Sequence, residues 1–197
     1  TFNRDNVQLI NLKEFPIHGI SSSSIEADKT YEIDTLILAT GFDAMTGALT
    51  SIDIIGRGGA KLKDQWETGA KSYLGLGIAN FPNLFTVTGP GSPSVLSNMM
   101  PSIEQHVNWI TDCIDWMETN DKKVIESSKS AEDEWMVLVN EIADMTIFTD
   151  TKSWYNGSNI DTKAKAFLPF IGVPMYAEML EEVVTEDYKG FIFDRPN

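Results

Sequence analysis

The sequence has 197 residues, of which 42% are hydrophobic and 22% are charged. This composition is typical of a globular domain and lies outside the range of disordered or low-complexity chains. With 15 basic and 29 acidic residues, the formal net charge is −14, and such a chain is repelled by nucleic-acid phosphates and anionic membrane surfaces. The sequence therefore predicts no nucleic-acid partner and no membrane partner.

Side chains that ligate metals or form disulfides are few. Cys113 is the only cysteine, which excludes an internal disulfide and fits a reducing, cytoplasmic compartment. His18 and His106 have no second ligand at helical spacing, so we expect no metal site. We expect Cys113 to be an inert, partly buried thiol and His106 to be packed or half-exposed.

The first part of the chain has the pattern of β structure. A short apolar run at 7–12 indicates a strand, and 16–20 indicates a turn. Within residues 31–40, the nearly continuous apolar run Thr35–Ala39 predicts a strand buried on both faces of a largely parallel sheet, ending at Gly41. Residues 44–80 are rich in glycine and lack a helical period, which favours short strands and turns.

A strand, a loop and a helix follow from Asn83 onwards. Residues 83–88 predict a short buried strand, and residues 89–93 are Gly-Pro-Gly-Ser-Pro. The following helix is expected to be capped by Ser97 or Asn98. Its predicted buried stripe consists of Ile103, Val107, Ile110, Ile114 and Met117.

Two further helices and a strand are predicted towards the end of the chain. Ser130, with Asp133 three residues later, indicates the start of one helix. The expected buried stripe of that helix is Trp135, Leu138, Val139, Ile142 and Met145. A long irregular segment spans 149–170, where burial of Trp154 is not assured. Pro174 begins the last helix, which is expected to bury Tyr176, Met179, Leu180 and Val183, and residues 191–193 indicate a closing strand.

The unit from Asn83 to Met117 carries the strongest chemical signal. A glycine loop that leads into a helix presents backbone N–H groups and the positive end of a helix dipole at one point, which suits an anionic or flat ligand. The alternative is a simple turn in which glycine and proline only fix the bend. A dinucleotide fingerprint is absent, because Asn80 stands where Gly75 and Gly77 would require a third glycine.

Six stretches together resemble Baeyer–Villiger monooxygenases, in the pattern of the phenylacetone and cyclohexanone monooxygenase group. These stretches are Thr1–Val7, Leu38–Ala44, Asn83–Phe85, Gly89–Ser94, Pro101–Val107 and Ser153–Tyr155. The resemblance implies an α/β fold, the C-terminal portion of a Rossmann-like FAD-binding domain with a mixed or partly parallel sheet. It further implies that residues 1–125 are the C-terminal half of that domain and that 126–197 are a helical extension with a cofactor and substrate loop.

The resemblance also implies FAD and NADPH as cofactors, and a reaction that inserts one oxygen atom of O₂ into a ketone to give an ester or lactone. By matching position, Gly89, Pro90 and Met99 would contact FAD, and Trp154 would contact the nicotinamide cofactor. Residues Ser94, Val95, Leu96 and Met99 would line the substrate pocket. At residues 39–41 the chain would cross between the flavin and NADPH domains.

The sequence departs from the family pattern in two places. The family loop usually continues Asn-Ile-Pro-Gly-Lys, whereas this chain has Asn159-Ile160-Asp161-Thr162-Lys163, which changes the turn chemistry. The N-terminal flavin half, the NADPH domain and the family's catalytic arginine have no counterpart here, so we expect a fragment that is inactive alone and supplies no catalytic residue. The alternative is a non-catalytic binding or interaction domain. A severed flavin sheet would expose an apolar patch of roughly several hundred Å² that faced the missing halves, so we expect self-association.

Overall fold

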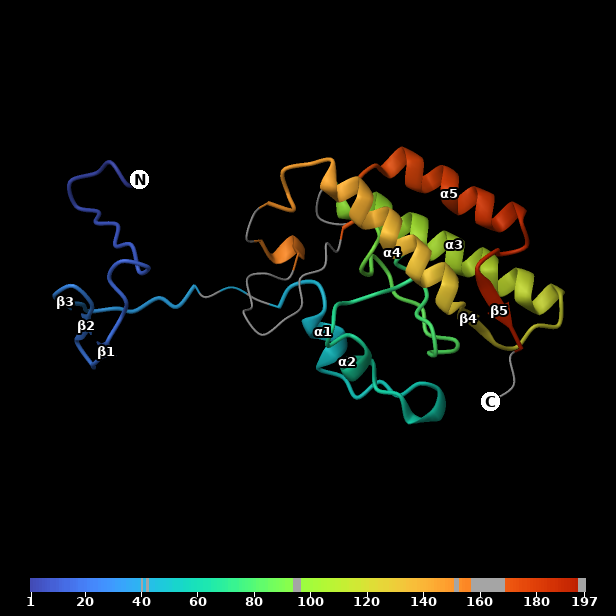
Figure 1. Ribbon diagram of the computed structural model, residues 1–197, viewed down its shortest axis with the longest axis horizontal. Helices are drawn as coiled ribbons and strands as arrows, with labels where there is room; N and C mark the ends of the chain where they lie inside the picture. Colours follow the sequence, from blue (N-terminus) through green and yellow to red (C-terminus); the bar gives the residue numbers. More distant parts are fainter. Residues whose placement is uncertain (40, 42, 94–96, 151–152, 157–168, 195–197) are drawn as a thin grey trace. The chain divides into compact units, whose positions relative to one another are not determined.

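The computed structural model describes residues 1–39, 41, 43–93, 97–150, 153–156 and 169–194 (Figure 1). The chain divides into two units, Thr1–Gly41 and Phe42–Asn197. Each unit is described below by itself.

The first unit contains a small antiparallel sheet in the order β1-β2-β3. Its strands are Gly19–Ile20, Ser24–Glu26 and Thr30–Glu32, and Ile25 pairs with both Ile20 and Tyr31. The serine loop after β1 is closed locally, because the Ser21 hydroxyl accepts the Ser24 amide at 2.9 Å. This serine loop is therefore a hydrogen-bonded hairpin turn between β1 and β2.

The sequence predicts two strands in this unit that the structure does not contain, so both predictions are wrong. Residues 7–12 form no strand, and neither does the apolar run Thr35–Ala39. In that run, Ile37 is 82% exposed and Leu38 is 72% exposed. A strand needs a neighbouring backbone with which to pair, and no described segment pairs with this run. The predicted burial on both faces therefore does not occur.

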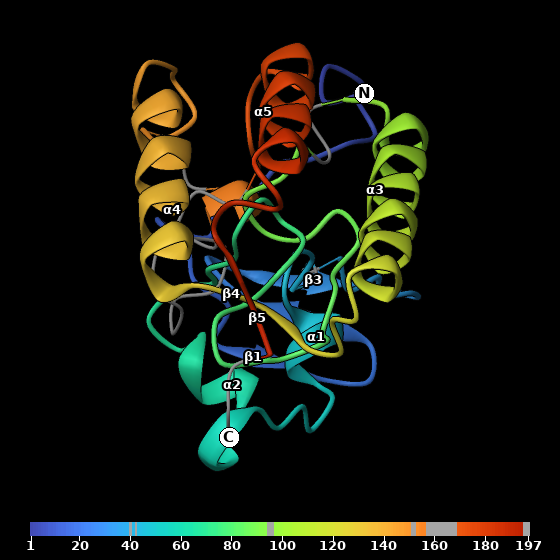
Figure 2. The ribbon, with the colours of Figure 1, turned by 90° about the vertical axis from the view of Figure 1, so that its right-hand side faces the viewer.

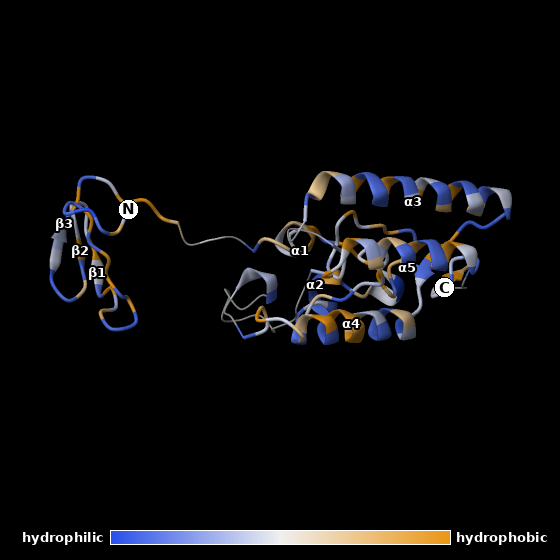
Figure 3. Ribbon diagram, turned by 90° about the horizontal axis from the view of Figure 1, so that it is seen from above, coloured by the Kyte–Doolittle hydropathy of each residue, from blue (hydrophilic) through white to orange (hydrophobic). Residues whose placement is uncertain are grey.

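Three long helices dominate the second unit (Figures 1 and 2). They are α3 (Met99–Thr119), α4 (Lys129–Asp144) and α5 (Val173–Thr185). Apolar and polar residues alternate around each of them, as Figure 3 shows. Their apolar faces share one core with the aromatic rings of Tyr73, Tyr188 and Phe191. Burial of these faces against each other is what stabilises the helices.

Helix α3 buries a different face from the one that its apolar pattern predicts. Its N-cap is Asn98, as expected, and its side chain accepts the Met100 amide at 3.1 Å. The buried residues, however, are Ser102, His106, Trp109, Cys113 and Met117. Val107 and Ile114 of the predicted stripe are exposed. Trp109 and Met117 supply the larger apolar contacts, while the buried polar atoms of His106 find partners in other segments.

Helix α4 begins two residues before the predicted position. Its N-cap is Ser128, whose hydroxyl accepts the Ala131 amide at 3.1 Å, so Ser130 lies within the first turn. Asp133 is not part of a capping box and instead pairs with Lys129 and Lys71. Of the predicted stripe, Trp135 and Val139 are buried, Leu138 and Ile142 are partly buried, and Met145 is exposed.

The predicted end of the chain is confirmed. Helix α5 has Pro174 in its first turn and buries Tyr176, Leu180 and Val183, with Met179 partly buried. Strand β5 (Phe191–Phe193) pairs antiparallel with β4 (Ile125–Ser127), a strand that the sequence did not indicate. β4 spans the expected domain boundary between 125 and 126, and that division stays a prediction.

Residues 44–80 form turns, as expected of a glycine-rich stretch, but the predicted short strands are reduced to isolated bridges such as Ile55 to Lys61 and Tyr73 to Gly77, and the short elements are helical. The elements are α1 (Gly47–Thr50), a 3₁₀ turn at Arg57–Gly59 and α2 (Leu62–Gln65). Leu62, Trp66, Ala70, Ile78 and Phe81 make a second, smaller core. The strand predicted at 83–88 is reduced to one bridge, Gly77 to Phe85, because the loop from 73 to 77 offers only a single pairing position.

The mixed α/β class that the sequence predicts is confirmed. Both sheets among the described residues are antiparallel, so the parallel pairing that we expected does not occur in this part of the chain.

Candidate functional site

The predicted cofactor loop, Gly89–Pro93, lies inside the second unit and is buried throughout. The Gly89 amide donates to the Gly75 carbonyl at 3.2 Å, and the Ser92 amide donates to the Gly89 carbonyl at 3.1 Å. The Pro90 carbonyl accepts the Ser72 hydroxyl. The Gly89 and Ser92 amides and the carbonyls of Gly89 and Pro90 are thus already used within the protein.

The amide that precedes the loop is held by a histidine. Thr88 N–H donates to Nδ1 of His106 at 2.9 Å, and Nε2 of His106 lies 2.7 Å from the Tyr176 hydroxyl. Since Nδ1 accepts, the neutral ring carries its proton on Nε2 and donates it to Tyr176. Tyr176 in turn donates to the Leu74 carbonyl at 2.6 Å. Burial lowers the pKa of His106 to about 4, so the ring is neutral at pH 7.

The loop glycines face protein rather than open space. A Cβ on Gly89 would lie 2.5 Å from Oγ1 of Thr86, and one on Gly91 would lie 2.9 Å from Nε1 of Trp135. Gly91 also has φ +85°, a conformation that favours glycine, and its carbonyl accepts Trp135 Nε1–H at 2.9 Å. The absence of side chains here is explained by internal packing, which supports the simple-turn interpretation of these two positions.

The start of α3 is more open than the loop. Met99 is partly buried and Met100 is 61% exposed. The 21-residue helix directs the positive end of its dipole at this point. The predicted pocket residues Ser94, Val95 and Leu96 lie outside the described residues, as do Thr40 and Lys163.

Trp154 lies in a 3₁₀ turn, Trp154–Asn156, and is partly buried. Its ring is 4.2 Å from that of Tyr155, centroid to centroid, and Tyr155 contacts Phe148. Among the described residues, no hydrogen bond or ring contact joins Trp154 to Gly89, Pro90 or Met99. The described structure thus joins the loop to α3 through Thr88 and His106, while the Trp154 ring packs on Tyr155, which itself packs against the main core.

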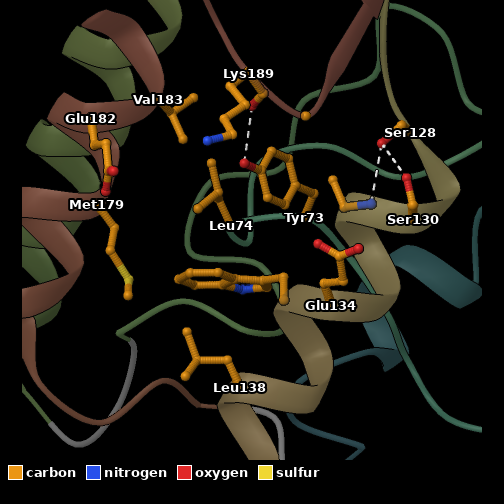
Figure 4. Close-up of a pocket in the computed structure, with 13 residues that line it drawn as sticks. Tyr73, Leu74, Ser128, Ser130, Glu134, Leu138, Met179, Glu182, Val183 and Lys189 are labelled. Carbon is orange, nitrogen blue, oxygen red and sulfur yellow. Dashed lines mark hydrogen bonds between the residues drawn. The ribbon is translucent and has the colours of Figure 1, made fainter. Parts of the chain in front are cut away.

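A pocket that sequence reasoning missed lies between α4 and α5 (Figure 4). Its volume is about 490 Å³. The apolar part of its lining comes from Tyr73, Leu74, Trp135, Leu138, Met179 and Val183. The predicted stripes of the two helices contain four of these residues, but nothing in the sequence shows that the helices leave a gap between them.

Two chemical features are absent from the described part of the chain. No group of three histidine, cysteine, aspartate or glutamate side chains there can hold a metal ion. None of its helices combines the length and the hydropathy that crossing a bilayer requires. The expected inert state of Cys113 agrees with its complete burial, which raises the pKa of its thiol to about 12.

Comparison with known proteins gives consistent relatives. No protein-family model matches the chain. It is 40% identical over 195 residues to phenazine N-monooxygenase PhzNO1 of Lysobacter antibioticus, covering 98% of this chain and 36% of the relative. It is 39% identical over 194 residues to cyclohexanone 1,2-monooxygenase of an Acinetobacter species, covering 97% of this chain and 35% of the relative.

Solved structures agree with these relatives. A closed crystal structure of cyclohexanone monooxygenase matches with a TM-score of 0.90 at 39% identity, covering 99% of this chain and 37% of that one. Steroid monooxygenase bound to NADP matches with a TM-score of 0.84 at 42% identity, covering 98% and 36%. The homologues that cover nearly all of this chain are thus monooxygenases, among them Baeyer–Villiger and cyclohexanone monooxygenases, and the chain spans about a third of their length.

Proposed function

We propose that this chain is the C-terminal part of an FAD- and NADPH-dependent monooxygenase that converts a ketone and O₂ into an ester or lactone. The observation that carries this proposal is the match over 99% of the chain to cyclohexanone monooxygenase, at 39% identity and a TM-score of 0.90. Related proteins include an acetone monooxygenase of Gordonia named as forming methyl acetate. Other matching structures contain FAD and NADP together.

The start of α3 would lie against one edge of the flavin, and its dipole and partial exposure support this. When bound, FAD would supply the redox chemistry that activates O₂, and NADPH would supply the hydride. The α3 dipole stabilises negative charge near Met99, and removal of water from that point strengthens the effect. Met99, partly buried beside exposed Met100, would contact the ring and border the ketone.

The contacts of Gly89 and Pro90 with FAD remain part of the proposal. Their backbone is bonded to Gly75 and Ser72, so these two residues would act by fixing the path of the chain into α3. Ser94, Val95 and Leu96, which continue that path, would line the ketone pocket and select ketones by size. Trp154 would hold the nicotinamide cofactor from its position beside Tyr155.

The described residues supply only part of such a site. Since the Gly89 and Ser92 amides are already bonded and the helix start is the more open part, the chain alone is expected to bind FAD weakly or not at all. Titration of the isolated chain with FAD, followed by flavin fluorescence, measures this. Tight stoichiometric binding would show that the chain holds a complete cofactor site and is not a part of one.

A chimera tests the proposed activity. This chain would replace the matching third of the Acinetobacter cyclohexanone monooxygenase, and the purified chimera would be assayed for bound FAD, NADPH oxidation and lactone. We expect FAD retention and ketone-dependent lactone formation. A folded, FAD-containing chimera that oxidises NADPH but forms no lactone from any ketone would favour the alternative, a non-catalytic interaction domain. In a matched control, Met100→Leu should keep activity, whereas Met99→Trp should reduce it.

Self-association through exposed apolar residues belongs to the same proposal. Leu36, Ile37 and Leu38 are exposed in succession in the first unit. A contiguous apolar run of this kind is typical of surface that another chain covers. In the whole enzyme the remainder of the flavin domain would cover it, and in its absence a second copy of the chain would.

A further inference from the structure

The pocket between α4 and α5 lies apart from every residue assigned above to FAD, NADPH or the ketone. Its volume of about 490 Å³ falls in the range of pockets that enclose a small ligand. Its use therefore does not depend on the proposed monooxygenase activity.

One wall of the pocket is a rigid aromatic surface. The Trp135 ring is fixed by the hydrogen bond from its Nε1–H to the Gly91 carbonyl and by stacking on Phe170, with centroids 5.0 Å apart and planes at 9°. Tyr73 meets Trp135 edge-on at 6.3 Å, and its hydroxyl donates to the Lys189 carbonyl at 3.0 Å. A preformed ring face of this kind attracts apolar groups and cations.

The mouth of the pocket is acidic. Glu134 comes from α4 and Glu182 from α5, and Figure 4 shows them on opposite sides of the opening. Neither carboxylate forms a salt bridge with another described residue, whereas Lys189 is bonded to Glu186 at 2.6 Å. These three glutamates and one lysine leave a net charge of −2. Burial and then the same three carboxylates raise the pKa of Tyr73 to about 12, which reports the same negative field.

We propose that this pocket binds a small organic cation, whose apolar body lies on Trp135 and Leu138 and whose ammonium group lies between Glu134 and Glu182. A neutral ligand of the same shape gains only the apolar contacts. An anion is repelled by the two carboxylates. A bare metal ion lacks the cluster of ligands that it needs among the described residues.

Calorimetric titration of the full chain with benzyltrimethylammonium tests the proposal. We expect saturable binding at one site, about tenfold tighter than that of benzyl alcohol, as two exposed ionic contacts together provide. Phenylacetate should not bind. In the ¹H–¹⁵N spectrum, the indole N–H resonance of Trp135 should shift during the titration, which locates the ligand even where affinities are low.

Two substitutions at the mouth and two matched controls distinguish binding at this pocket from general attraction of a cation to a negatively charged protein. Glu134→Gln and Glu182→Gln should each weaken binding about two- to fivefold, as expected for the loss of an exposed ionic contact. Glu141→Gln and Glu178→Gln, exposed on the same helices but outside the pocket, should leave it unchanged. The four variants carry equal charge, and all alter surface side chains, so folding is preserved.

Three results would overturn the proposal. These are equal affinity for the cation and benzyl alcohol, equal weakening by the pocket and control variants, and an unshifted Trp135 resonance at saturation. Each result is independent of FAD binding and of the chimera assay, so failure here leaves the proposed function standing, and the reverse also holds.

Discussion

His106 and Tyr176 share a buried hydrogen bond of 2.7 Å although 70 positions separate them in the chain. The bond joins α3 to α5, and through Thr88 and Leu74 it reaches the turn before the glycine loop and the loop at 73–77. Four segments thus meet at one pair of side chains. Because the rings are fully buried, their polar atoms depend on each other for partners.

Removal of the Tyr176 hydroxyl should destabilise the second unit. Tyr176→Phe leaves both Nε2 of His106 and the Leu74 carbonyl without this partner, which should lower the free energy of unfolding by about 1–3 kcal/mol. Urea unfolding followed by tryptophan fluorescence measures this, since all five tryptophans lie in the second unit. In the control, Tyr188→Phe removes a hydroxyl that lies near the Cys113 thiol, at most a weak partner, and should cost less. The opposite order would contradict the assigned network.

Stability should fall on acidification because of His106. The unfolded ring takes up a proton near its ordinary pKa of 6.5, whereas burial lowers the folded pKa to about 4. The unfolded state therefore binds more protons between these values, and the free energy of unfolding decreases by up to about 3 kcal/mol as the pH falls from about 6.5 to 4. His106→Gln should flatten this part of the pH profile.

The comparison with His106→Gln isolates this one group. Burial raises the pKa of Glu132, so its protonation favours the folded state on acidification and acts in the opposite direction. That contribution is common to both proteins and cancels in their difference. Identical slopes between pH 7 and pH 4.5 in the two urea series would show that His106 does not titrate as assigned.

Gly91 should be intolerant of a methyl group. Gly91→Ala places a Cβ 2.9 Å from Trp135 Nε1 at φ +85°, and so disturbs both the backbone conformation and the bond to the Gly91 carbonyl. We expect a loss of about 2–4 kcal/mol, the sum of strain and a damaged buried hydrogen bond. Gly58→Ala is the matched control, since Gly58 has φ +62° and nothing within 4 Å of the new Cβ. It should cost only about 1 kcal/mol.

The exposed apolar run should drive association. Light scattering of the chain is expected to show a mass that rises with concentration, and Ile37→Lys combined with Leu38→Lys should reduce that rise. Val107→Lys, a change at an exposed apolar position on α3, should not. A monodisperse monomer at every concentration would contradict self-association.

Local pattern predicts this fold best where one element buries one apolar stripe. Helix α5 is such a case, because Tyr176, Leu180 and Val183 are both its periodic residues and its buried ones. Helix α3 is not, because burial of His106 requires acceptors and donors from Thr88 and Tyr176, which no local pattern contains. The run Thr35–Ala39 has the pattern of a strand, but pairing needs a second backbone.

The candidate site also combines features that local sequence patterns predict with features that they do not. The loop Gly89–Pro93 and its helix are found from sequence because glycine, proline and a capping asparagine are local signals. The Gly89 amide points into the protein because it donates to the Gly75 carbonyl, and this contact joins two positions that are not close in the sequence. The pocket between α4 and α5 needs Tyr73 and Lys189 as well as both helices, and no single stretch of sequence contains that information.

The bonds that close the loop before α3 bear on the order of assembly. Because the Thr88 and Gly89 amides are paired with His106 and Gly75 inside one folded unit, no ligand is needed to give this turn its shape. The second unit can thus fold first and present the start of α3 as a finished surface. A cofactor or partner that binds later then meets a preformed surface. Binding therefore costs little conformational entropy for ordering this turn.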